Sequence, residues 1–119
     1  RDAARFGLLF ARYGLWEDQR ILSEHWVNRS SALYSIDSDI MGYGFYWWIS
    51  REPRFAQYGM YSAQGVGNQM IAVLPDIDLV ITDMKMPGVG GLELCRQLKE
   101  NPRLNQVPVV LMTAWRSLI

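Results

Sequence analysis

The sequence predicts an α+β fold in which an antiparallel meander with flanking helices is extended by one βαβ unit with a parallel strand. Apolar residues at helical spacing open the chain, and aromatic, β-branched segments separated by turns fill its middle. Near the carboxyl end, a strand, a helix and a second apolar strand follow in order. A helix between two neighbouring strands crosses over right-handedly and sets them parallel.

Two helices are predicted at the start of the chain. Asp2 can cap the first, whose apolar residues recur at helical spacing, and Gly14 provides its stop. The second is short and follows Ser23 through Trp26 and Val27. Both precede the predicted sheet.

Four antiparallel strands are predicted next. They are "GYGFYWWI" (42–49), "YGMYSA" (58–63), "QMIAVL" (69–74) and "DLVITD" (78–83), rich in the aromatic and β-branched residues that strands favour. A tight turn at Pro75-Asp76 joins the last two. These segments form the predicted meander.

The carboxyl end supplies the βαβ extension. Leu92, Cys95 and Leu98 mark one face of a helix over about 90–101, which Asn101-Pro102 ends. "VPVVLMT" (107–113) is an apolar run typical of a strand buried on both faces in a parallel sheet.

Composition excludes several classes of function. Half of the 119 residues are hydrophobic and the formal net charge is +0, so we expect no nucleic-acid partner and no disordered acidic tail. The single cysteine cannot form an internal disulfide or a cysteine metal site. No apolar run reaches the length of a membrane span, so we expect no membrane association.

A change of composition divides the chain. All aromatic residues but Trp115 lie at or before Tyr61, whereas both lysines, Lys85 and Lys99, follow it. There is no low-complexity linker between the two parts. The change indicates two sources joined within a structured region.

Residues 1–80 resemble the C-terminal segment of serine β-lactamase-like hydrolases. The resemblance rests on "RDAARFGLLFARYGLWEDQRILSEHWV", "GYGFYWWI" and "YSAQGVGNQMIAVLPDIDLVI", in that order. It implies a serine nucleophile in a Ser-x-x-Lys motif that attacks an ester, amide or β-lactam, assisted by a Tyr-x-Asn-like motif. Neither motif is present, and a hydroxyl without an adjacent base is a weak nucleophile. We therefore lean towards no enzyme activity and assign no catalytic residue.

A remnant of the third hydrolase motif aligns with Ala63, Gln64 and Gly65, where only the glycine matches. One interpretation is a substrate-binding edge strand whose glycine lets substrate approach the backbone. The other is an ordinary turn, "QGVGN", which joins two strands, and we favour it because there is no nucleophile to serve.

Residues 76–115 resemble the central part of a response regulator receiver domain. In "DLVITDMKMPGVGGLELCRQLKENPRLNQVPVVLMTA" an apolar strand ends in Asp83, and Pro87 and Gly91 form the following turn. The resemblance implies that Asp83 is a phospho-acceptor and that the Thr113 hydroxyl senses the phosphoryl group. It also implies that Mg²⁺ binds the Asp83 carboxylate and the backbone carbonyl of Lys85.

Two parts of that family's site have no counterpart. No upstream apolar strand ends in two adjacent acids, and the chain contains no lysine after Thr113. Under this interpretation the cofactor is Mg²⁺, the partner a histidine kinase and the location cytoplasmic; otherwise no cofactor is expected. The alternative is a strand-end Asp83 without phosphorylation chemistry, favoured because Mg²⁺ needs several oxygen ligands.

The main hypothesis is a hybrid fragment without catalysis. A hydrolase segment (1–80) and a partial receiver-like segment (76–119) would share the strand 78–83, because "PDIDLVIT" suits both families. The alternative is a phosphorelay module acting through Asp83, and a third possibility is an assembly piece. An exposed surface of Phe6, Leu9 and Phe10 is expected to cause self-association.

Overall fold

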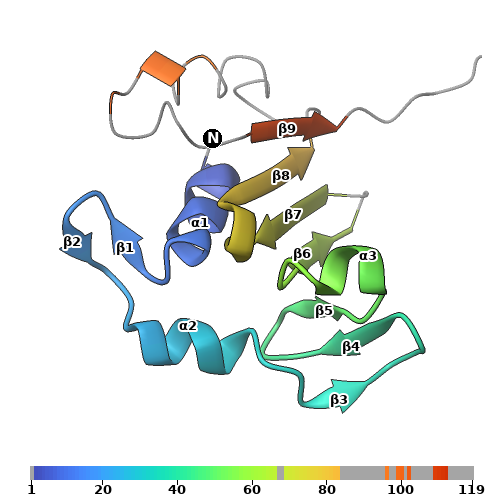
Figure 1. Cartoon of the computed structure of the whole chain (residues 1–119). Coiled ribbons are helices and arrows are strands. Elements are labelled where there is room, and N and C mark those ends of the chain that lie inside the picture. Colours follow the sequence, from blue (N-terminus) through green and yellow to red (C-terminus); the bar gives the residue numbers. More distant parts are fainter. Residues whose placement is uncertain are drawn as a thin grey trace, which may run out of the picture.

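The computed structural model describes residues 2–66, 69–83, 96, 99, 100, 102 and 109–112. Seven strands form one sheet in the order β3-β4-β5-β6-β7-β8-β9, and β1 (Leu15–Trp16) and β2 (Gln19–Arg20) form a separate hairpin. Figure 1 shows α1 (Asp2–Ala11) against the β7–β8 half of the sheet. Within the described residues, no helix is long and apolar enough to cross a membrane.

The strands are short at one edge of the sheet and longer at its centre. Their bounds are β3 (Ser35–Ile36), β4 (Met41–Tyr43), β5 (Trp48–Ser50), β6 (Tyr61–Gly65), β7 (Gln69–Leu74), β8 (Leu79–Asp83) and β9 (Val109–Met112). Each pair from β3 to β8 is antiparallel. The predicted antiparallel meander and the α+β class are therefore supported.

The last pair of strands is parallel. Val80 lies opposite Val109, and Asp83 lies opposite Met112. Of the connection between them, the structure describes only Arg96, Lys99 and Glu100, which are helical, and Pro102. The predicted crossover helix and its handedness thus lie largely outside the described residues, and the complete βαβ unit stays a prediction.

Helix α1 packs closely on β7 and β8 because Gly7 faces them. A Cβ at this position would lie 2.7 Å from Ile71 Cγ2 and 2.8 Å from Val80 Cγ1. Leu8 and Phe10 are buried in the hydrophobic core. The prediction of an exposed surface of Phe6, Leu9 and Phe10 is therefore wrong for Phe10, which belongs to the core. Phe6 is exposed, and Leu9 is half-buried.

The end of α1 is a Schellman motif. The Gly14 N–H donates to the Leu9 carbonyl at 2.8 Å, and the Tyr13 N–H donates to the Phe10 carbonyl at 3.0 Å. Tyr13 adopts φ 52°, and Gly14 adopts φ 87°. Gly14 was predicted as the stop, but the left-handed residue that ends the helix is Tyr13 and Gly14 follows it.

An aromatic cluster fills the core between α1 and the sheet. Trp47 contacts the rings of Phe10 at a centroid distance of 4.8 Å and of Tyr61 at 4.9 Å. Phe6 stacks on the outer side of Trp47 at 5.9 Å. Burying large aromatic rings in contact stabilises the fold, and this cluster joins α1 to β5 and β6.

The predicted strand 42–49 is two strands joined by a turn. Tyr46 adopts φ 64°, and the Gly44 N–H donates to the Trp47 carbonyl at 2.8 Å. The predicted strand 58–63 begins only at Tyr61, because Gly59 turns the chain at φ 66° after the short helix α3 (Pro53–Ala56). Aromatic residues were mistaken for continuous strand in both places.

The remaining helices flank the sheet. Helix α2 (Glu24–Ser30) follows Ser23 as predicted, and the Ser23 hydroxyl caps it by accepting from the Trp26 N–H at 3.1 Å. A 3₁₀ turn, η1 (Pro75–Ile77), replaces the predicted tight turn before β8. Asp78 then enters β8 in the left-handed conformation.

Candidate phospho-acceptor site at the end of strand β8

Strand β8 forms because four of its residues, Leu79 to Thr82, are aliphatic or β-branched and fit a buried central position. Val80 faces α1 and is 3% exposed, and Thr82 is fully buried. Asp83 is the last residue of the strand. The strand is paired with β7 as far as Thr82 and with β9 as far as Asp83, and these pairings position the backbone at its end.

The beginning of β8 is fixed by α1. The Arg12 guanidinium lies 3.5 Å from the Asp78 carboxylate, and the Asp78 N–H donates to the Pro75 carbonyl at 3.1 Å. Because both side chains are partly exposed, this ion pair contributes little to stability.

The end of β8 lies beside the end of β9. Asp83 is opposite Met112, the last residue of β9, and Thr113 is the next residue in the sequence. The carboxyl ends of adjacent parallel strands form the edge at which open sheets bind ligands. The backbone of Asp83 thus lies at such an edge, beside the strand that precedes Thr113 in the sequence.

Four predicted site residues, Lys85, Pro87, Gly91 and Thr113, lie outside the described residues. The side chain of Asp83 is likewise not described. The roles assigned to all five, including the Mg²⁺ contacts of Asp83 and Lys85, stay predictions.

The predicted Mg²⁺ site stays untested, because the side chain of Asp83 and all of Lys85 lie outside the described residues. Among the residues that the structure does describe, no group of three or more His, Cys, Asp or Glu side chains could hold a metal ion. Asp78 stands at the opposite end of β8, roughly 16 Å from Asp83 at the usual rise of a strand. Since Mg²⁺ takes near-octahedral oxygen coordination, we derive no chemical step through it.

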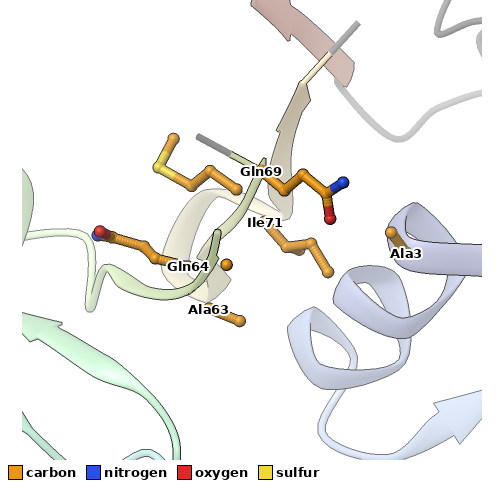
Figure 2. A pocket seen from close by; sticks show the side chains of 7 residues that line it. Ala3, Ala63, Gln64, Gln69 and Ile71 are labelled. Carbon is orange, nitrogen blue, oxygen red and sulfur yellow. The ribbon is translucent and has the colours of Figure 1, made fainter. Parts of the chain in front are cut away.

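The residues predicted to be a remnant of a hydrolase motif lie elsewhere, on β6. Ala63, Gln64 and Gly65 line a pocket of about 250 Å³ between the β6–β7 hairpin and the start of α1. Figure 2 shows Gln69 and Ile71 directed towards Ala3, and Gln64 directed away from it. Gln64 donates to the Ser62 hydroxyl at 3.2 Å.

The nearest buried titratable group does not suit proton transfer. Burial, and secondarily the neighbouring Tyr13, raises the pKa of Tyr61 well above its usual value. Tyr61 therefore keeps its proton at neutral pH and cannot act as a base. Among the described residues that line this pocket, none carries a nucleophile or a general base.

A sequence model described as "Response regulator receiver domain" matches residues 56–118, just over half of the chain. The chain belongs to the response regulator receiver family.

Individual relatives agree with this family. The phosphate regulon transcriptional regulatory protein PhoB of Rhizobium meliloti is 46% identical over 37 residues, which cover 31% of this chain and 16% of PhoB. The response regulator PleD of Caulobacter vibrioides is 49% identical over 41 residues, covering 34% of this chain and 9% of PleD. The two-component response regulator ARR16 of Arabidopsis thaliana is 41% identical over 58 residues, covering 45% of this chain and 35% of ARR16.

The family assignment favours the alternative prediction over the main one. It supports the receiver part of the hybrid hypothesis, whereas the hydrolase part gains no support from it. The receiver match begins at the end of α3, upstream of the predicted boundary at residue 76. The chain spans about a third or less of the length of these receiver proteins, so their activities and partners belong to them.

Proposed function

We propose that the chain is a phospho-acceptor module of two-component signalling, with Asp83 as the residue that receives the phosphoryl group. The observation that carries the proposal is the parallel pairing of Asp83 with Met112, within a receiver-family match. It puts the backbone of Asp83 at an edge suited to ligand binding.

The chemistry needs one nucleophilic carboxylate oxygen. An Asp83 oxygen attacks the phosphorus of a donor, the bond from phosphorus to the donor's leaving group breaks, and an aspartyl phosphate forms. The Thr113 hydroxyl would donate to a phosphoryl oxygen, since it follows the strand residue paired with Asp83. The natural donor in this proposal is a phosphohistidine of a histidine kinase, which implies a cytoplasmic location.

The test is intact-mass measurement after incubation with acetyl phosphate, at several Mg²⁺ concentrations. We expect one phosphoryl adduct on the parent chain and none on Asp83→Asn. Asp39→Asn is the matched control, because Asp39 is an exposed loop residue far along the chain from β8. A folded parent that gains no adduct, or an Asp83→Asn chain that still gains one, would refute the proposal.

The missing acidic pair gives this proposal a second consequence. Without it, Mg²⁺ should bind weakly, because each absent carboxylate removes a ligand charge. The yield of adduct should therefore rise with Mg²⁺ without reaching a plateau. A sharp plateau at low Mg²⁺ would indicate ligands that this sequence does not suggest.

A second candidate is the hybrid fragment, with a hydrolase-derived part over residues 1–80. The antiparallel pairing of β6, β7 and β8 favours it, because strand–helix units would otherwise precede a receiver's phospho-acceptor strand. This part would serve as a folded support for β8 without catalysis. The DNA that flanks the reading frame tests it: an upstream Ser-x-x-Lys motif would support a hydrolase origin, and a complete upstream receiver segment would refute it.

A further inference from the structure

A second cavity lies on the face of the sheet opposite α1. Because side chains alternate along a strand, Tyr61 and Val73 face α1 while Ser62 and Ala72 face the other way. On that other face, a cavity of about 160 Å³ is bounded by β4 to β7 and α3. It lies outside the candidate phospho-acceptor site.

The walls of this cavity are apolar and adaptable. Met41, Met60 and Met70 contribute thioethers, and Trp48 and Phe55 contribute rings. Methionine sulfurs make favourable contacts with aromatic rings and adjust to irregular shapes. An apolar cavity of about 150 Å³ is large enough to bind benzene. The cavity therefore suits a single small ring.

One buried polar group in the cavity could orient a ligand. Ser62 lines it, is 2% exposed, and accepts a hydrogen bond from Gln64 at 3.2 Å. Among the described residues, the structure shows no acceptor for the hydroxyl proton of Ser62. Buried donors are normally satisfied, so an oxygen placed in the cavity would complete this hydrogen bond.

The rim favours an uncharged ligand. Glu52 reaches the cavity, but its carboxylate is paired with the Arg54 guanidinium. A charged ligand would lose its hydration against apolar walls without gaining a partner.

We propose that this cavity is a binding site for a small neutral aromatic molecule with one oxygen, of about the size of phenol. The Ser62 hydroxyl donates to the oxygen, and the methionines and Trp48 contact the ring. This site does not include Asp83. Ligand binding here can therefore be tested separately from phosphorylation.

Ligand-observed NMR titration of the whole chain tests the site with phenol, toluene and benzoate as probes. Phenol and toluene have similar shapes, but only phenol carries the oxygen. We expect phenol to bind about threefold to tenfold more tightly than toluene, the range of one neutral hydrogen bond. We expect no binding of benzoate, because it is charged.

Three variants identify the residues. Ser62→Ala should remove the preference for phenol and leave toluene binding unchanged. Ser50→Leu should abolish the binding of both phenol and toluene, because Ser50 also lines the cavity and the larger side chain would fill it. Ser35→Ala, an exposed position on β3, is the matched control and should bind as the parent does.

Several results would overturn the proposal. These are no saturable phenol binding by the folded parent, equal affinity for phenol and toluene, an unchanged preference in Ser62→Ala, or binding that persists in Ser50→Leu. If Ser62→Ala does not fold, the ratio of phenol to toluene affinity in the parent decides alone.

Discussion

Single residues control how closely the helix and the sheet of this protein approach. Gly7 lacks the Cβ that would collide with Ile71 and Val80, so α1 packs directly on the strands that precede Asp83. Glycine is unfavourable inside a helix, and here the close contact compensates for that cost. The role of Gly7 could not be predicted from the sequence, because helical periodicity does not report the distance to a neighbouring element.

Gly7→Ala tests this packing. In an exposed helix the same change would stabilise by about 1 kcal/mol, but here we expect destabilisation by about 1–2 kcal/mol from overpacking. The measurement is the free energy of unfolding in urea. Arg5→Ala on the same helix is a control that does not add volume at this interface. An increase in stability for Gly7→Ala would contradict the packing described.

Tyr61 links stability to alkaline pH. Burial raises its pKa above the unfolded value of about 10, so the folded state holds the proton more tightly than the unfolded chain. Its contribution to stability is therefore complete below about pH 10 and is lost as the pH rises beyond that. Tyr61→Phe should reduce the loss of stability between about pH 9 and 11, measured by chemical denaturation; an unchanged slope would disagree with a buried hydroxyl.

At the scale of elements, the sequence predicted long and regular segments well. The predicted strand "QMIAVL" and the observed β7 have the same bounds, and α2 follows Ser23 as predicted. The β1–β2 hairpin, β3 and α3 were missed. The hairpin turns at Glu17, whose φ is 53°, and glutamate, unlike glycine, asparagine or aspartate, is not a residue that indicates a left-handed turn position.

The two phenylalanines of α1 should differ in their effect on stability. Phe10 is 4% exposed and contacts Trp47 and Tyr61, so Phe10→Ala should cost about 3–5 kcal/mol. Phe6 is 46% exposed, so Phe6→Ala should cost less than half as much, although it loses its stacking on Trp47. Thermal and urea unfolding of both variants measure this; equal losses would mean that α1 is packed differently.

At the scale of the whole molecule, the position of the candidate site could be predicted but its surroundings could not. A receiver-like pattern located Asp83 at a strand end, and β8 ends there. The parallel partner was also expected, because an apolar run followed a helical pattern. The antiparallel strands before β8 were predicted from aromatic and β-branched segments, whereas the hydrolase resemblance of the same region gains no support from the receiver-family match.

The whole chain should not hydrolyse a chromogenic ester or a β-lactam above background. No serine is followed three positions later by lysine, and Tyr61 holds its proton. Turnover that persists after repurification and is abolished by a serine-directed inhibitor would contradict this expectation.

An exposed groove affects the behaviour of the whole chain in solution. Phe6, Trp16 and Ile21 line a hollow of about 610 Å³ between α1 and the β1–β2 hairpin. Self-association through this surface stays a prediction. It would appear as an apparent mass in analytical ultracentrifugation that rises with concentration.

The most direct test of the central claim is to locate the phosphoryl group. After incubation with acetyl phosphate, borohydride reduction converts an aspartyl phosphate to homoserine, and peptide sequencing by mass spectrometry identifies the modified position. We predict homoserine at position 83, in the peptide that contains the end of β8, and no reduction product at the other aspartates. Homoserine elsewhere, or none from a chain that remains folded, would contradict Asp83 as the phospho-acceptor.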